Sequence, residues 1–239
     1  MINMIQEISS IAQNNPDGPY YVYPLPRGRM EVWTSSPAKV LGANSFLYLH
    51  QIHSTILVKS ADLLKAQAAG MDAPSADGIY GSPQTPECWV IKTADCMPIA
   101  FIGEKACAFV HAGRRGLWDN ILLSPVIKEL KPKFIFIGPH IKKCCYEVEL
   151  ALLKEAKNFE GKVFYQEITP AMDCCSPVLG GLPSPKILLD LTQTATAQLM
   201  EHYPAAQILL AKPCTCCAKN LHSYRREQNK ERNFNLWRF

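Results

Sequence analysis

The sequence predicts an α/β fold, a single domain over residues 1–239 in which a mixed β-sheet is built with interspersed helices. Short apolar runs rich in β-branched and aromatic residues alternate with longer segments of helical pattern. No internal repeat, low-complexity tract or linker divides the chain. Its 48% hydrophobic residues are enough for a sizeable core without disulfide bonds.

Each expected element follows from its local pattern. Residues 1–30 include a run dense in Pro and Gly, and we expect an irregular lead-in there. Strands are expected at residues 31–36, 44–60, 87–95, 97–103, 105–113, 133–139, 162–167 and 207–212. Helices are expected at residues 61–70, 117–130, 146–159 and 186–203.

The charge balance excludes little beyond a strong polyanion binder. A formal charge of +4, from 25 basic and 21 acidic side chains, gives no argument for nucleic-acid binding but leaves small anions open. The N-terminal residues lack the pattern of a signal peptide, and no apolar run approaches the length of a membrane span. We therefore expect a cytoplasmic monomer with no membrane partner.

Ten cysteines are a high count for 239 residues. In a reducing compartment most should be free thiols, and most should act as small buried hydrophobes. They form three adjacent pairs and four single positions: Cys144–Cys145, Cys174–Cys175, Cys216–Cys217, and Cys88, Cys96, Cys107 and Cys214.

Two apolar runs that flank Gly103 each carry a good metal ligand, Cys96 on the first and His111 on the second. Gly at the first central position suits a two-residue type II′ turn, which would set Cys96 directly opposite His111. Opposed side chains have Cβ atoms about 4.5–5.5 Å apart, close enough for one ion to bind both. Pro98 cannot donate to a β-ladder and indicates an edge strand or a bulge.

A third ligand must come from elsewhere, and His53 is the best candidate. It lies in a strand-like apolar stretch, where period-2 alternation turns His50 to the opposite face. Three protein ligands with an open fourth position would make a catalytic zinc arrangement, with one zinc per chain. The alternative from the pattern alone is that Cys96 and His111 are two satisfied core residues.

Six short motifs occur in order along the chain: QIH (Gln51–His53), SADG (Ser75–Gly78), TADCMP (Thr93–Pro98), HAGRRG (His111–Gly116), GPHIKKCCYEV (Gly138–Val148) and SYRR (Ser223–Arg226). Each motif is weak, but the ordered set is specific. Through this set the chain resembles the YfiH-type family of multicopper polyphenol oxidase or laccase-like proteins, which also includes purine nucleoside phosphorylases.

The resemblance implies that His53, Cys96 and His111 bind zinc in a pocket shared with substrate. It also implies phosphorolysis of adenosine, inosine, guanosine and methylthioadenosine by inorganic phosphate, with deamination of adenosine. Copper fits poorly, because a multicopper oxidase needs many His ligands and this chain has six His in all. Arg114 stands where the family has Trp.

For phosphorolysis, Arg115, Arg225 and Arg226 are expected to hold phosphate through their guanidinium groups. Arg114 should point elsewhere and modify how substrate enters. Asp95 is a candidate proton shuttle, with Asp77 as the other choice. Cys96 belongs to the catalytic site chiefly as a metal ligand.

Four other functions remain open from the sequence. Relatives suggest a cell-wall precursor amide hydrolase, and the metal could also be structural in a ligand-binding protein without turnover. Cys145-Tyr146-Glu147 with Pro213-Cys214-x-x-Cys217 mimics a zinc nucleobase deaminase, although no H-x-E occurs. An iron–sulfur or structural zinc cluster could form from Cys214, Cys216, Cys217 and another pair.

Overall fold

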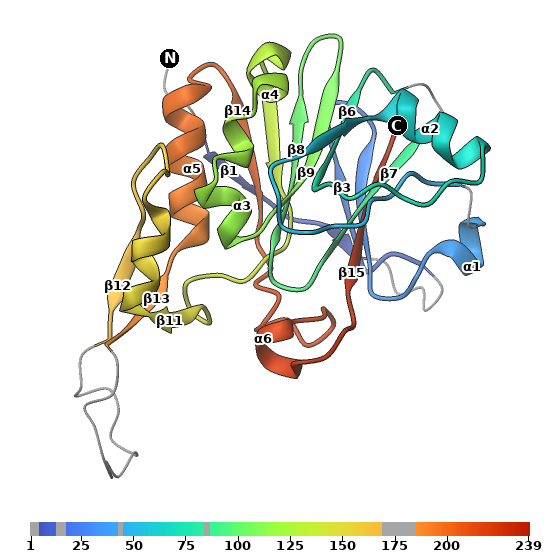
Figure 1. Ribbon diagram of the computed structural model, residues 1–239. Helices are drawn as coiled ribbons and strands as arrows, with labels where there is room; N and C mark the ends of the chain where they lie inside the picture. The colour runs from blue at the N-terminus through green and yellow to red at the C-terminus, as the bar shows by residue number, and fades with distance from the viewer. Residues whose placement is uncertain (1–4, 13–17, 43–44, 84–86, 169–184) are drawn as a thin grey trace.

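The computed structural model describes residues 5–12, 18–42, 45–83, 87–168 and 185–239. Within these residues the chain forms three β-sheets with helices packed on them (Figure 1). The largest sheet is mixed, with parallel and antiparallel neighbours. The predicted α/β class with a mixed sheet is therefore confirmed.

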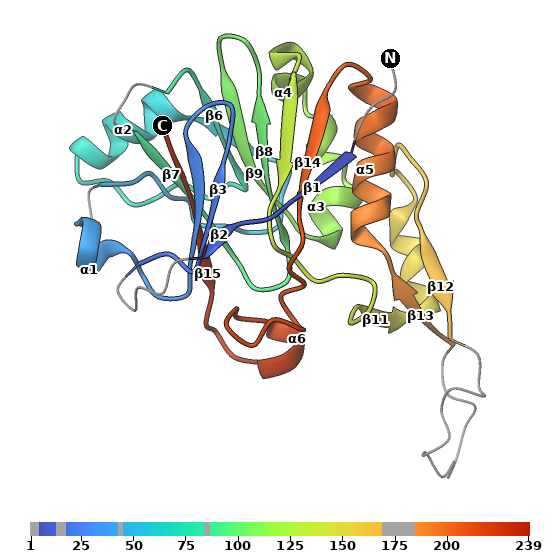
Figure 2. The ribbon, with the colours of Figure 1, turned by 180° about the vertical axis from the view of Figure 1, so that it is seen from behind.

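The largest sheet has seven strands in the order β1-β14-β10-β8-β9-β6-β5. Neighbours are parallel from β1 to β10 and between β6 and β5, and antiparallel elsewhere. Figure 2 shows β1 beside β14. The strands are β1 (Ile5–Ile8), β5 (Leu57–Lys59), β6 (Gly78–Gly81), β8 (Met97–Ile102), β9 (Cys107–Ala112), β10 (Phe134–Ile137) and β14 (Gln207–Ala211).

Two smaller antiparallel sheets accompany it. The five-stranded sheet has the order β2-β3-β4-β15-β7 and the three-stranded sheet the order β11-β13-β12. Their strands are β2 (Ile11–Ala12), β3 (Tyr21–Pro24), β4 (Arg29–Trp33), β7 (Cys88–Thr93), β11 (Glu147–Glu149), β12 (Tyr165–Glu167), β13 (Lys186–Leu189) and β15 (Asn233–Arg238).

Both faces of the large sheet are covered. In β8, Ile99 and Phe101 pack with the helices, whereas Ala100 and Ile102 pack against the five-stranded sheet. This alternation explains why every residue of β8 and β9 is buried. The helical segments are α1 (Ala38–Leu41), α2 (Ser60–Ala68), α3 (Arg114–Trp118), η1 (Ile121–Leu123), α4 (Pro125–Leu130), η2 (Leu150–Ala156), α5 (Leu191–His202) and α6 (Tyr224–Glu227).

The irregular lead-in expected over residues 1–30 is wrong for much of that segment. β1 adds to the edge of the large sheet beside β14, and β3 pairs with β4. Gly18, Pro19, Pro26 and Gly28 lie in the connections, whereas Pro24 is the last residue of β3. No helix within the described residues is long and apolar enough to cross a membrane.

Four other expectations are corrected by the structure. Of the strand expected at residues 44–60, the described residues 45–56 form a loop with isolated bridges, and only β5 near its end is a strand. The helix expected at 117–130 is broken where Asn120 adopts φ 62°, and α4 starts again with Ser124 as its cap. The helices expected at 146–159 and 186–203 each begin as strands, β11 and β13, which pair with each other.

The hairpin register is also corrected. Residues 103–106 form a four-residue loop closed by the Gly103 N–H donating to the Ala106 carbonyl at 2.9 Å, so Pro98 faces His111. Gly103 has no left-handed backbone; a Cβ there would lie 2.5 Å from the Leu130 carbonyl oxygen. Pro98 lies in an inner strand, near its start, where its carbonyl accepts from Gly138.

Candidate metal centre

His53, Cys96 and His111 meet in space despite the wrong register. One ligand atom from each lies within 4.8 Å of the others, and the Cys96 sulfur is 4.0 Å from His53 Nε2. His111 is the last residue but one of β9, whereas Cys96 lies just before β8, after Asp95 turns the chain with φ 93°. The three side chains could hold one metal ion, as the sequence predicted.

The carboxylate of Asp77 positions two of the three candidate ligands, His53 and His111. Its buried carboxylate accepts from the backbone N–H groups of Ile52, His53 and Ser54 at 3.3, 3.0 and 2.6 Å. These bonds hold the loop in which His53 adopts φ 61°. Asp77 Oδ1 also lies 2.8 Å from His111 Nδ1. A proton on Nδ1 donated to Asp77 leaves Nε2 of His111 for a metal.

Charge pairs within the triad shift its protonation. Burial opposes ionisation of Cys96, but the charge and hydrogen bonds of His111 and His53 outweigh it and lower the thiol pKa to about 6. Burial disfavours charged His111, but Cys96 and Asp77 outweigh it and raise the imidazole pKa to about 9. The Asp77 pKa falls to about 2, because hydrogen bonds from His111 and Ser54 overcome burial. The site favours a thiolate, the form that binds metal.

The triad opens on a cavity of about 620 Å³, a size suited to a small ligand. His53 is exposed at its rim, Cys96 is half-buried and His111 is buried. The lining comes from the ends of β7 and β9, from the loop around His53 and from α6: His50, Gln51, His53, Lys92, Thr93, Ala94, Asp95, Cys96, His111, Tyr146, Tyr224, Arg225 and Arg232.

The lining away from the triad carries cationic groups beside aromatic rings. The guanidinium of Arg225 lies 5.5 Å from the centre of the Tyr146 ring. Lys92 and Arg232 line the same cavity. The side chain of Gln51 bonds both the N–H and the carbonyl of Lys92 at 2.8 Å, which ties the His53 loop to β7.

The predicted arginines separate in the structure. Arg225 lines the cavity, whereas Arg115 is exposed on α3 and lies outside the lining. Arg226 donates to the carbonyls of Thr215, Cys216, Ala218 and Leu221 and pairs with Glu227. Its guanidinium is therefore committed to holding α6 on the preceding turn, and the expectation that it holds phosphate is not supported by its position.

Asp95 lines the cavity, but both of its oxygens accept hydrogen bonds. Oδ1 accepts from the Thr215 hydroxyl and Oδ2 from the backbone N–H of Arg225, each at 2.7 Å. This arrangement suits a positioning residue better than the proton shuttle expected from the sequence. Arg114 is not among the residues that line the cavity: it pairs with Glu155 at 2.5 Å, lies 4.9 Å from the centre of the Trp118 ring and interacts with the side chain of Tyr146.

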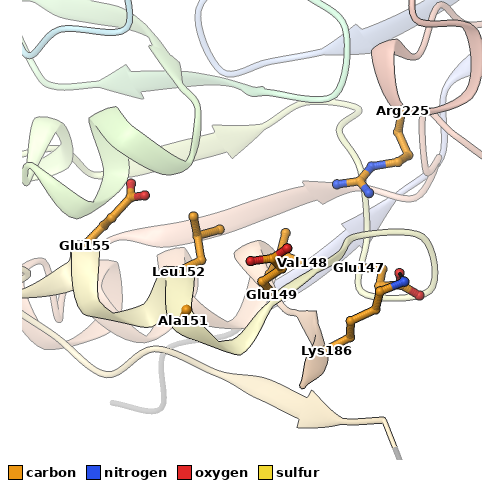
Figure 3. Close-up of a pocket in the computed structure, with 8 residues that line it drawn as sticks. All are labelled: Glu147, Val148, Glu149, Ala151, Leu152, Glu155, Lys186 and Arg225. Carbon is orange, nitrogen blue, oxygen red and sulfur yellow. Dashed lines mark ion pairs between the residues drawn. The ribbon is translucent and has the colours of Figure 1, made fainter. Parts of the chain in front are cut away.

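Arg225 also borders a second hollow of about 560 Å³ (Figure 3). Glu149 of β11 and Glu155 of η2 face it, and Lys186 pairs with Glu147 at 2.7 Å. Carboxylates dominate this lining, so the second hollow suits an anion less well than the cavity beside the triad.

Sequence reasoning missed Lys92, Tyr146 and Tyr224 as cavity residues. Tyr146 and Tyr224 lie inside the quoted CCYEV and SYRR motifs, which was an available signal. Lys92 carried none, because only the pairing of β15 with β7 brings it beside the C-terminal segment.

Comparison with known proteins places the chain in a family. Residues 34–236 match the family described as multi-copper polyphenol oxidoreductase laccase. The chain belongs to this family. The resemblance found in the sequence is thereby confirmed, and the match covers every ligand of the triad.

Relatives of the family carry a different activity in their names. A purine nucleoside phosphorylase of Aquifex aeolicus is 33% identical over 147 residues, which are 59% of this chain and 61% of the relative. The chain thus spans less than two thirds of that protein. A purine nucleoside phosphorylase of Borreliella burgdorferi is 29% identical over 199 residues, 80% of this chain and 78% of the relative.

Solved structures agree on the fold. A Neisseria meningitidis protein matches with a TM-score of 0.62 and 25% identity, covering 84% of this chain and 77% of that one. YfiH of Bacillus licheniformis matches with a TM-score of 0.64 and 21% identity, covering 84% and 78%. The mixed α/β architecture is therefore shared with known members.

Proposed function

We propose that this chain is a zinc-dependent purine nucleoside phosphorylase that acts on adenosine, inosine, guanosine and methylthioadenosine and also deaminates adenosine. One observation carries the proposal: the cavity of about 620 Å³ combines the triad of His53, Cys96 and His111 with a cationic wall. A metal ion bound by the triad and a phosphate bound by the cationic wall could therefore contact the same nucleoside. The relatives named purine nucleoside phosphorylase support this reaction class.

The surroundings of the triad support zinc over copper. Two imidazoles and one thiolate also form electron-transfer copper sites, which add a weak axial ligand. Here His53 is exposed and the triad opens on a cavity, which suits a three-ligand zinc site with an exchangeable fourth position. The other group of potential ligands among the described residues contains only cysteines, so it gives no histidine-rich copper centre.

The cationic wall supports phosphate binding. Arg225, Lys92 and Arg232 would draw the anion into the cavity, because guanidinium and ammonium groups bind its oxygens through charge-assisted hydrogen bonds. The Tyr146 ring supports the Arg225 guanidinium from one side. Phosphate held there is kept at high effective concentration near the anomeric carbon of a bound nucleoside.

Other residues fix these groups. Asp95 holds the first turn of α6 through the Arg225 N–H, and Asp77 orients His111 and the His53 loop. Zinc, when bound by the triad, would supply Lewis-acid polarisation of the nucleoside. The chain itself supplies orientation of the metal ligands and attraction of phosphate.

The test is incubation of protein of known zinc content with adenosine or inosine, with and without phosphate. Free base and ribose phosphate in equal amounts, formed only with phosphate, are expected, and ammonia is expected from adenosine. Cys96→Ala is the matched inactive control, since it removes one ligand of the ion. Release of free base that does not depend on phosphate, or no release of free base at all, refutes the phosphorylase proposal. A cell-wall precursor amide hydrolase or a zinc-containing binding protein then becomes the better hypothesis.

A further inference from the structure

In addition to the triad, four cysteine thiols form a second group of potential metal ligands. Ligand atoms of Cys144, Cys145, Cys214 and Cys217 all lie within 4.8 Å of one another. The two segments follow β10 and β14, which are parallel neighbours in the large sheet. Carboxyl ends of parallel strands meet at one edge, so the fold brings both turns together.

The sulfur positions match one tetrahedral ion. Cys144 Sγ lies 3.7 Å from Cys145, 3.8 Å from Cys214 and 3.7 Å from Cys217, and Cys145 lies 3.3 Å from Cys217. Four sulfurs bound at about 2.3 Å to one tetrahedral zinc lie about 3.8 Å from each other. A disulfide needs sulfurs about 2.05 Å apart, and all four cysteines are free.

The backbone around Cys214 suits a bound thiolate. The Lys142 N–H donates to its sulfur at 3.4 Å, and the N–H groups of Cys216 and Cys217 also bond it. Such peptide N–H groups orient metal-bound thiolates and offset their charge. Cys214-x-x-Cys217 has the spacing common in structural zinc sites.

We propose that Cys144, Cys145, Cys214 and Cys217 form a closed, structural zinc site. The set differs from a deaminase centre, where three ligands leave the fourth position open for water. Here Cys144 fills the fourth position, and Glu147 pairs with Lys186 at 2.7 Å instead (Figure 3). The sulfurs are too close together for an iron–sulfur cluster, in which the ligands lie around several metal atoms.

The consequence of this site is mechanical. The ion would clamp the turn that leads into Tyr146 to the turn that carries Thr215. Tyr146 supports Arg225, and Thr215 donates to Asp95. The zinc would therefore hold two parts of the cavity wall in register without contacting substrate.

Metal analysis of the full chain tests the proposal. Wild type should hold about two zinc ions per chain, and Cys217→Ser and Cys144→Ser should each hold about one. Cys216→Ser is the matched control: Cys216 lies in the same turn but outside the group, so zinc content should stay at about two. Equal zinc in Cys217→Ser, Cys144→Ser and Cys216→Ser would overturn the site.

Two further measurements, on proteins that keep all four cysteines, remain decisive if the cysteine-to-serine variants misfold. X-ray absorption at the zinc edge of Cys96→Ala protein, which keeps only this site, should show four sulfur neighbours at about 2.3 Å. Nitrogen or oxygen neighbours there overturn the proposal. Mass spectrometry of wild type, denatured with free thiols blocked, should find no bond between Cys145 and Cys217; a disulfide there equally refutes it.

Discussion

Replacing Asp77 by Asn should weaken metal binding, although Asp77 touches no metal. Asn keeps the size of the side chain but removes its charge and turns one acceptor oxygen into an N–H donor. If the amide oxygen faces His53 and His111, the amide nitrogen faces the N–H and hydroxyl of Ser54. Rotating the amide leaves the same conflict at the histidines.

The magnitude follows from the bonds that are lost. Asp77 accepts five hydrogen bonds, from three backbone N–H groups, one hydroxyl and one imidazole. Each bond to a charged group is worth about 1.5–3 kcal/mol, and Asn must lose at least two of them. Part of this cost appears as lower stability. The part that releases the loop and His111 should lower zinc affinity about 10- to 100-fold.

The assay is competition for zinc against a chromophoric chelator, with the unfolding midpoint measured on metal-free protein. Asp119→Asn is the matched control, because the same chemical change falls on an exposed residue outside the site. Zinc affinity of Asp77→Asn within about threefold of wild type, in a folded protein, would refute the claim that Asp77 orients the ligands.

Three further outcomes follow from the same geometry. Arg225→Ala should raise the phosphate concentration for half-saturation about tenfold, whereas Arg115→Ala should leave it unchanged; the same phosphate saturation in both variants contradicts the cationic wall. Gly113→Ala would place a Cβ 2.8 Å from the Cys96 sulfur, so zinc affinity should fall at least about tenfold by chelator competition. Gly116→Ala is its control, since the atom nearest to a Cβ there is 3.4 Å away. Equal zinc affinities of the two variants would show that the Cys96 side chain moves aside without loss of metal binding. In metal-free protein, the rate at which iodoacetamide labels Cys96 should be half-maximal near pH 6, because His111 stabilises the thiolate and the thiol is protonated only below this pKa. Peptide mapping that places the midpoint near pH 9 contradicts the pairing of Cys96 with His111.

Much of the fold could be predicted from the sequence, because buried strands and helices have characteristic short patterns of apolar residues. β8 is apolar throughout and β9 is apolar apart from His111, and α2 ends at Ala68, two residues before Gly70 with φ 68°, the residue expected to close it. The errors fall where partners distant in sequence decide. β1 exists because β14 offers a parallel edge, and β11 exists because β13 pairs with it. The local sequence pattern of β1 or β11 does not indicate which strand it pairs with.

The site was found for partly wrong reasons. The hairpin argument chose Cys96 and His111 through a register that does not occur. The alternation argument chose His53 from a strand that is a loop held by Asp77. Ligand identity could be predicted because few residue types bind zinc, but the geometry that unites them depends on a buried carboxylate and on unusual backbone angles.

Adjacent arginines show most clearly what a sequence leaves undecided. Arg225 and Arg226 occupy one short motif, yet Arg225 faces the cavity and Arg226 binds the carbonyls of the cysteine turn. Asp95 decides between them, because its carboxylate fixes the start of α6 through the Arg225 N–H. The other carboxylate oxygen of Asp95 accepts a hydrogen bond from the hydroxyl of Thr215, the residue after Cys214. The cationic wall and the four-cysteine group are thus linked through Asp95 and Thr215, so loss of zinc from the cysteines should displace Arg225.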